Sequence, residues 1–434
     1  MRKGFLLVFA GFLAAAFMAA SVSYAGTTEI VSVDSNGKPG NSGSNEPSIS
    51  SDGRFVAFHS FADNLVPDDT NGMADVFIHD RQTGKTEIIS KDSSGKLGNN
   101  HSDDPAISAD GRFAAFHSGA DNLVPGDTNG MADVFVHDKQ TGATEIISKD
   151  SSGKLGNNHS DDPAISADGR FAAFRSGASN LVPGDKNGMT DIFVHDRQTG
   201  KTKLISKNSA GELGNNDSSE PAISANGRYV VFRSFASNLV KDDTNNKSDV
   251  FVHDIQTGKT KLISKDSAGI LGNNDSSEPA ISADGRYVAF RSWASNLVPG
   301  DTNGKSNIFV HDRKTGETKI ISKGSDGKQA KGPSSLPSIS ADGRFVAFLS
   351  GAGNLVQGDT NGMDDAFVHD RQTGKTEIIS VDSAGNQGKG GGCFIPVINA
   401  DGRFVAFESE ADNLVPGDTN GTTDVFVRVR GASQ

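Results

Sequence analysis

The chain has 434 residues, of which 35% are hydrophobic, and a formal net charge of −12. A surface this acidic repels nucleic acid and anionic lipid, so both are excluded as partners, whereas cations and basic partners are not. The single cysteine, Cys393, excludes an internal disulfide, and the fold must rest on its hydrophobic core.

Residues 1–25 have the pattern of a secretory signal peptide. Arg2 and Lys3 precede an apolar run from Phe5 to Ala20, and Ser23–Ala25 provides a small-residue cleavage site. Removal of the two basic residues would take the net charge from −12 to −14. An uncleaved anchor is the alternative, but the run is short for a membrane span and no later segment approaches one. No cysteine follows the cleavage site, so we expect a periplasmic or secreted protein that neither spans a membrane nor carries a lipid.

The remaining residues, 26–434, are filled by repeats, which leaves no room for a second domain. Each repeat contains a turn in which Asp or Asn is followed by Gly and Arg. Successive glycines of this turn are 58 residues apart, except for the last pair, which is 59 apart. These glycines are Gly53, Gly111, Gly169, Gly227, Gly285, Gly343 and Gly402.

Each repeat predicts four short strands, and no helical period appears outside residues 1–25. In the second repeat the predicted strands are 105–108, 113–116, 134–137 and 144–148. Tight turns join the first strand to the second and the third to the fourth, whereas loops of about 14 or 15 residues form the other two connections. The second strand, Phe-Ala-Ala-Phe, is apolar on both faces, so we expect it to be buried on both sides.

Seven such repeats predict an all-β fold, a seven-bladed β-propeller of four-stranded blades. The repeat region begins with a lone fourth strand, 28–32, and ends with a lone third strand, 424–427. The N-terminal strand can therefore complete the last blade and close the ring. An open solenoid is the alternative, but unmatched ends of this kind favour closure.

The segment Ile-Ser-Ala-Asp-Gly-Arg-Phe-Val-Ala-Phe, as at 339–348, resembles the repeat of TolB-like propellers, also called PD40 or WD40-like β-propeller repeats. The resemblance covers all seven copies of the first two strands, and it implies the fold more strongly than a function. The segment Asn-Leu-Val-Pro-Gly-Asp-Thr-Asn-Gly, as at 122–130, is similar to a long-repeat subgroup of bacterial exported propellers. The repeats are longer than those of TolB, and TolB's separate N-terminal α/β domain has no counterpart here.

In such a propeller the two tight turns of each blade share one face and the two long loops share the other. We expect function on this long-loop face, because binding residues usually lie on loops held by a rigid scaffold. An Asp-x-Asn-Gly-x-x-Asp motif precedes the third strand and offers the oxygen ligands that Ca²⁺ prefers, although the ligand set is incomplete. The alternative is an Asx-type turn that binds its own backbone. The candidate metal ligands are Asp69, Asn71, Asp75, Asp127, Asn129, Asp133, Asp185, Asn187, Asp191, Asp359, Asn361, Asp365, Asp418, Asn420 and Asp424. In the fourth and fifth repeats the motif is broken, by Asn246 in place of Gly and by Asn307 in place of the last Asp.

A second candidate is an acidic residue that precedes the proline of the innermost strand. These residues should circle the channel mouth, where they could bind a cation or a basic partner. The alternative is a solvated rim whose carboxylates accept hydrogen bonds from neighbouring loops. The residues are Glu46, Asp104, Asp162, Glu220 and Glu278, and Leu336 and Ile395 break the series.

The third candidate is the set of positions where the repeats differ. Arg175, Arg233 and Arg291 end the second strand in three successive repeats, and Phe235 and Trp293 follow two of them. Arginine and exposed aromatic residues are typical of binding patches. The alternative is that the aromatic side chains fill gaps between loops and the arginines pair with the acidic rim.

Six repeats end the third strand with His-Asp, as at His137-Asp138, which suggests catalysis or zinc binding. Adjacent residues of a strand point to opposite sides, however, so the two side chains of a pair do not face each other. We therefore expect a structural role, and no nucleophile elbow, catalytic triad or zinc motif is visible.

The sequence thus predicts an exported, non-catalytic, monomeric binding or structural module. Its partner, a protein or a glycan, would meet the long-loop face, and Ca²⁺ but no organic cofactor would stabilise the protein. The alternatives are a polysaccharide lyase or hydrolase that acts at the channel mouth, and a TolB-like scaffold of the cell envelope.

Overall fold

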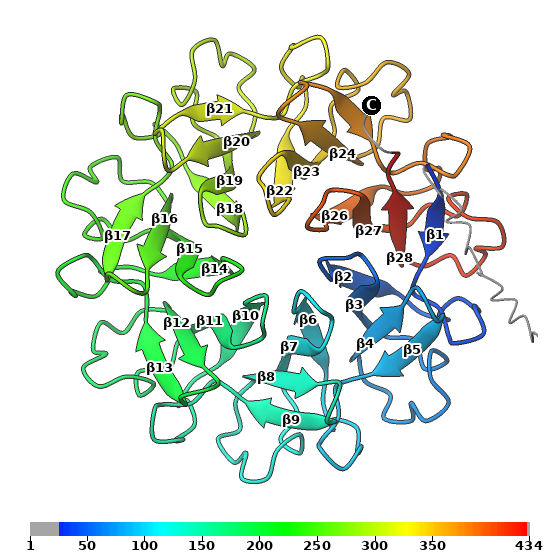
Figure 1. The fold of residues 1–434 in the computed structure, drawn as a ribbon, viewed down its shortest axis with the longest axis vertical. Coiled ribbons are helices and arrows are strands. Elements are labelled where there is room, and N and C mark those ends of the chain that lie inside the picture. The colour runs from blue at the N-terminus through cyan, green and yellow to red at the C-terminus, as the bar shows by residue number, and fades with distance from the viewer. Residues whose placement is uncertain (1–25, 432–434) are drawn as a thin grey trace, which may run out of the picture.

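A computed structural model describes residues 26–431 and shows seven four-stranded sheets around a central axis (Figure 1). The predicted all-β, seven-bladed propeller is confirmed. The predicted signal peptide, 1–25, lies outside the described residues. Within those residues no helix is long and apolar enough to cross a membrane.

The blades, numbered 1 to 7 from β2, each contain four antiparallel strands. The innermost strands are β2 (Ser44–Ile49), β6 (Ser102–Ile107), β10 (Ser160–Ile165), β14 (Ser218–Ile223), β18 (Ser276–Ile281), β22 (Ser334–Ile339) and β26 (Cys393–Ile398). The second strands are β3 (Phe55–Ser60), β7 (Phe113–Ser118), β11 (Phe171–Ser176), β15 (Tyr229–Ser234), β19 (Tyr287–Ser292), β23 (Phe345–Ser350) and β27 (Phe404–Ser409). The third strands are β4 (Asp75–Asp80), β8 (Asp133–Asp138), β12 (Asp191–Asp196), β16 (Asp249–Asp254), β20 (Asn307–Asp312), β24 (Asp365–Asp370) and β28 (Asp424–Val429). The outermost strands are β5 (Lys85–Ile88), β9 (Ala143–Ile146), β13 (Lys201–Leu204), β17 (Lys259–Leu262), β21 (Thr318–Ile320), β25 (Thr376–Ile378) and β1 (Thr28–Ile30).

The N-terminal strand closes the ring, as predicted. β1 pairs antiparallel with β28, so that Thr28 lies opposite Arg428 and Ile30 opposite Phe426. Just beyond β1, the Ser32 hydroxyl donates a hydrogen bond of 2.6 Å to Oδ1 of Asp424. Blade 7 therefore contains both ends of the described chain, and the open solenoid is ruled out.

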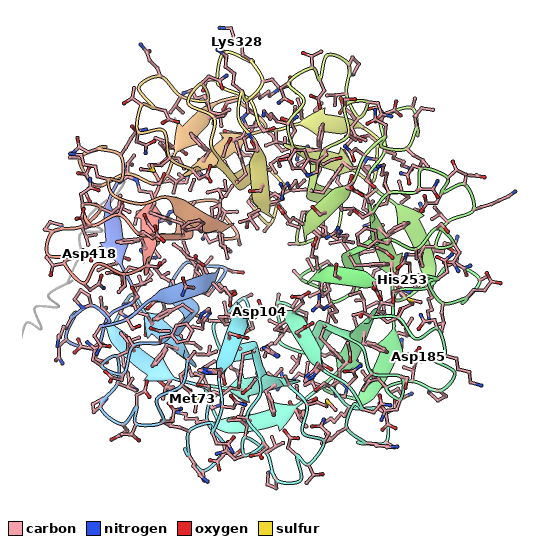
Figure 2. The ribbon with its side chains drawn as sticks, turned by 180° about the vertical axis from the view of Figure 1, so that it is seen from behind. Met73, Asp104, Asp185, His253, Lys328 and Asp418 are labelled. Carbon is pink, nitrogen blue, oxygen red and sulfur yellow. The ribbon has the colours of Figure 1, made fainter. Side chains whose placement is uncertain are left out.

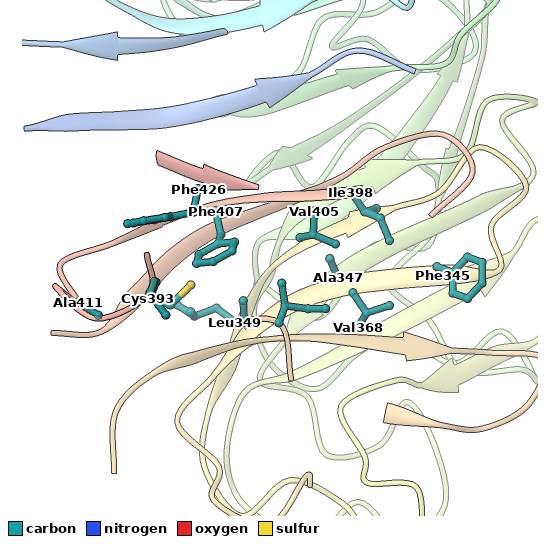
Figure 3. Close-up of a cluster of buried hydrophobic side chains, with 13 residues drawn as sticks. Phe345, Ala347, Leu349, Val368, Cys393, Ile398, Val405, Phe407, Ala411 and Phe426 are labelled. Carbon is teal, nitrogen blue, oxygen red and sulfur yellow. The ribbon is translucent and has the colours of Figure 1, made fainter. Parts of the chain in front are cut away.

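The hydrophobic core lies between neighbouring blades. Within blade 1, the rings of Phe58 and Phe77 stack at a centroid distance of 5.9 Å, and six further blades repeat this pair. Figure 3 shows the cluster between blades 6 and 7, where Val368 lies with Phe407 and the buried Cys393. The second strand of each blade packs against the neighbouring blades on both sides. Both of its faces are therefore apolar, as the sequence indicated.

The tight turn between the first two strands fits closely against the preceding blade. Gly111 has a φ of 71°, and a Cβ at this position would lie 2.1 Å from Cδ2 of Phe55 in blade 1. Only glycine satisfies both the left-handed conformation and the short approach. The repeated glycine is therefore a contact between blades as well as a turn residue.

The innermost strands begin three residues earlier than predicted, since β6 starts at Ser102 instead of Pro105. The pairing of β6 with β7 shifts register between Asp103 and Ala106, where Asp104 has a φ of 53°. A β-bulge of this kind interrupts the ladder without ending the strand. The acidic residue thus lies inside the strand, and all seven equivalent positions have positive φ.

Candidate functional site

The two faces of the ring differ in loop length, as expected. On the short-turn face, Arg112 donates two hydrogen bonds to the carboxylate of Asp138, which joins the two tight turns of blade 2. On the long-loop face, the Asn122 side chain donates to the carbonyl of Leu97 and accepts from the N–H of Asn99, which joins successive loops. The predicted candidates of the rim, the patch and the metal motif all lie on this second face or at its edge.

The acidic rim links neighbouring blades. Figure 2 shows Asp104 beside the central opening, with Asp185 and Asp418 farther out. Because the bulge removes the N–H of Asp104 from its own ladder, this N–H donates to Oε2 of Glu46 in the preceding blade, at 2.9 Å. The N–H of Glu278 donates to Glu220 in the same way, at 2.5 Å. The rim carboxylates therefore hold the innermost strands together, as the structural alternative predicted.

Crowding of these carboxylates changes their acidity. Burial raises the pKa of Asp104 well above its usual range, and the carboxylates of Glu46 and Asp162 raise it further. Burial also raises the pKa of Glu408 to about 7. Glu408 is the second-last residue of β27 and accepts the N–H of Glu46. In blade 7 it thus replaces the rim carboxylate, because the equivalent rim position holds Ile395, whose side chain cannot accept a hydrogen bond.

The three arginines are paired with acids and do not present free charge. Arg175 makes two hydrogen bonds of 2.6 Å to Asp161. Arg233 lies 3.2 Å from Glu220, and Arg291 lies 2.7 Å from Glu278. In blades 1 and 2 histidines take the same position: His59 contacts Glu46 and His117 contacts Asp103. The arginines of the predicted patch are thus paired with acids, as the alternative interpretation of the sequence proposed.

The aromatic residues of the patch are exposed. Phe235 is 45% exposed and Trp293 43%, so neither fills a gap between loops. The guanidinium carbon of Arg233 lies 4.6 Å from the Phe235 ring centroid, and that of Arg291 lies 5.2 Å from Trp293. The Nε atoms of both arginines are buried without a hydrogen-bond partner. We call Arg233, Phe235, Arg291 and Trp293 the aromatic patch.

Two further exposed aromatic residues were not among the predicted site residues. Phe61 is 54% exposed, and its ring lies 6.1 Å from that of His101. Phe394, 37% exposed, occupies the innermost strand of blade 7 at the position that Asp103 holds in blade 2. The sequence could have indicated both residues, because most other repeats have a small or polar residue at the equivalent positions.

The Asp-x-Asn-Gly-x-x-Asp motifs form compact turns that hydrogen bonds of their own side chains hold together. In blade 2, Oδ1 of Asn129 accepts the N–H of Met131, and its Nδ2 donates to Oδ2 of Asp133 at 2.7 Å. Oδ1 of Asp133 accepts the Ser148 hydroxyl. The first residue, Asp127, is 7% exposed, and neither of its carboxylate oxygens has a hydrogen-bond partner. Among residues 26–431, no three His, Cys, Asp or Glu side chains are grouped so as to hold a metal ion.

The His-Asp pairs have the expected structural role. His137 contacts the hydroxyl of Thr144 at 2.9 Å, and this hydroxyl donates to the carbonyl of Lys91 in the preceding blade. Since the hydroxyl has one proton, His137 must donate through Nδ1. Burial lowers the pKa of His137 to about 4, so the ring is neutral near pH 7. Asp138 faces Arg112 instead, and the two side chains never meet.

These features define a seven-bladed β-propeller with short turns on one face and long loops on the other. No family model matches the sequence, and no curated protein matches it either. Among solved structures, the propeller domain of the Trilobed protease from Pyrococcus furiosus is 14% identical with a TM-score of 0.54, and the match covers 89% of this chain and 93% of that domain. Oligogalacturonate lyase from Vibrio parahaemolyticus is 12% identical with a TM-score of 0.51, covering 92% and 89%. TolB from Acinetobacter baumannii is 18% identical with a TM-score of 0.41, and the match covers 70% of this chain and 58% of TolB. Identities this low establish the fold alone.

Proposed function

We propose that this chain is an exported, non-catalytic binding module related to the TolB-like propellers, monomeric and located in the periplasm or outside the cell. Its partner, a protein or a glycan, binds the aromatic patch on the long-loop face. The strongest support is the exposure of Phe235 and Trp293, at 45% and 43%. Their rings lie against Arg233 and Arg291, which are held by ion pairs with Glu220 and Glu278.

The patch is suited to binding because it is organised before a partner arrives. Glu220 and Glu278 hold the two arginines, and each guanidinium lies against its aromatic ring. A rigid aromatic face loses little conformational entropy when it stacks on a sugar ring or an apolar side chain. Since the arginine charges are already compensated, the patch does not select for an anionic partner.

The single tryptophan gives a direct test, because Trp293 is the only residue of its kind and belongs to the patch. The mature protein is titrated with a glycan panel and with separate envelope proteins while tryptophan emission is recorded. A partner that binds here shifts the emission. Phe235→Ala should weaken its binding at least ~10-fold, a typical effect for a central aromatic contact. Ile270→Ala is the matched control, since Ile270 is 59% exposed but lies in a loop between blades. A partner whose affinity is unchanged by Phe235→Ala would contradict the proposal.

A second candidate function is a polysaccharide-active enzyme at the rim. It is favoured by Asp104, whose raised pKa would let it act as a general acid beside the carboxylates of Glu46 and Asp162. Turnover of a glycan from the panel that is abolished by Asp104→Asn, with unchanged melting, would establish this function in place of the first.

A further inference from the structure

Blade 5 differs from the other blades at the motif before its third strand, because Asn307 replaces the last aspartate. The Nδ2 atom of Asn307 lies among four oxygens. It is 3.4 Å from each carboxylate oxygen of Asp301, 3.1 Å from Oδ1 of Asn303 and 3.2 Å from the carbonyl of Lys305. An amide group that carries partial positive charge thus occupies a cage of oxygens.

In blade 2 the same cage has no such group. The equivalent residues are Asp127, Asn129, Met131 and Asp133, so a carboxylate replaces the amide. Both oxygens of Asp127 are buried without a hydrogen-bond partner. Asp133 accepts hydrogen bonds from Asn129 and Ser148, whereas Asp127 accepts none. A buried carboxylate without a partner is costly, because it has lost its water.

A second replacement accompanies the first. In blade 5, Nε2 of Gln329, from the next loop, donates to Oδ1 of Asp301 at 2.7 Å. Leu155 occupies this position in blade 2, and its side chain has no hydrogen-bond donor. Blade 6 is intermediate: Gln387 donates to Asp359 at 3.0 Å, but Asp365 is retained and its Oδ2 has no partner. In blades 5 and 6, side-chain amides thus donate to the first aspartate of the motif, as a bound cation would compensate its charge.

We propose that Ca²⁺ fills this cage in blades 1, 2, 3, 4 and 7, and that the amides of Asn307 and Gln329 replace it in blade 5. In blade 2 the ligands are both oxygens of Asp127, Oδ2 of Asp133, Oδ1 of Asn129 and the carbonyl of Met131. Carboxylate, amide and carbonyl oxygens together form the donor set of Ca²⁺, whereas Mg²⁺ retains more of its water. Only two carboxylates contribute, which agrees with the lack of any group of three acidic or histidine ligands in residues 26–431.

Blade 4 belongs to this group although its motif is broken in the sequence. Asn246 adopts a φ of 55°, close to the 67° of Gly130 in blade 2, because asparagine tolerates the left-handed conformation. Asn245 donates to Asp249 at 2.7 Å, as in the intact motifs. The site thus depends on Asp243 and Asp249, and the glycine is replaceable.

Calorimetry with Ca²⁺ alone, on EGTA-treated mature protein, tests the proposal. The variant Asp133→Asn with Leu155→Gln gives blade 2 the two residues of blade 5, so it should fold and bind one Ca²⁺ fewer. The reciprocal variant, Asn307→Asp with Gln329→Leu, should bind one Ca²⁺ more. Melting followed by circular dichroism should show a higher midpoint with Ca²⁺, since the ion binds the native state alone.

Three results would overturn the proposal, and none depends on the aromatic patch. These are a flat calcium titration, the same stoichiometry in the parent and both variants, and equal affinity for Mg²⁺ and Ca²⁺. Folding of each variant is checked by its cooperative melting, so that loss of binding is not confused with unfolding.

Discussion

Near the end of β27, the buried Glu408 takes the position that histidine or arginine holds in blades 1 to 5. Burial raises its pKa from 4.5 to about 7. A carboxyl group whose pKa is raised in the folded state stabilises the fold at low pH, and this stabilisation is lost as the pH rises from about 4.5 to about 7. Glu408→Gln should therefore be neutral near pH 4 and more stable than the parent at pH 8, by up to about 3 kcal/mol. Urea denaturation at the two pH values measures the difference.

The matched control is Glu410→Gln, because Glu410 is exposed two residues away. Its effect on the free energy of unfolding should be within about 0.5 kcal/mol at both pH values. A Glu408→Gln variant that is less stable than the parent at pH 8 would contradict this, because it would show that the charged carboxylate stabilises the fold.

Among the elements, the turn between the first two strands carries the clearest prediction. Gly111→Ala adds a Cβ that meets Phe55 of the preceding blade at 2.1 Å, in a left-handed conformation. The backbone strain costs about 1–2 kcal/mol and the overpacking about 1–3 kcal/mol, so the variant should lose roughly 2–5 kcal/mol of stability. Gly142→Ala is the control: its φ is 75°, but nothing lies within 4 Å of the added atom. Gly142→Ala should lose only the stability that the backbone strain costs. Equal losses of stability in the two variants would contradict a contact between blades at Gly111.

The sequence predicted elements better than it predicted the partners of their side chains. The spacing of the glycines and the unmatched end strands led directly to seven blades and a closed ring. The bulge at Asp104 was not predicted, because a residue before proline usually adopts an extended conformation and here φ is 53°. Pairing of the arginines with the acidic rim was one of two alternatives, and Arg175 instead makes its hydrogen bonds to Asp161, the residue before the rim acid. The relation of Asn307 to Gln329 depends on two loops that the strand ladder brings together.

For the whole molecule, closure of the ring by β1 should determine both stability and the oligomeric state. Removal of residues 26–33 exposes the edge of β28 and deletes Val31, which is 1% exposed in the core. A free edge pairs with other chains, so the truncated protein should melt at a lower temperature and form oligomers. Gel filtration with light scattering checks this, and a truncated monomer with unchanged melting would contradict closure as the source of stability.

Under the proposed function, a partner binds the long-loop face and the short-turn face binds none. An aromatic photo-crosslinking residue at position 235 retains the ring of the patch, and one at the exposed Gln140 reports on the opposite face. Both proteins are expressed in the native cell, irradiated and examined by mass spectrometry. We expect a defined adduct from position 235 that is lost with Trp293→Ala, and none from position 140. A defined adduct from position 140 and none from position 235 would contradict the proposed function.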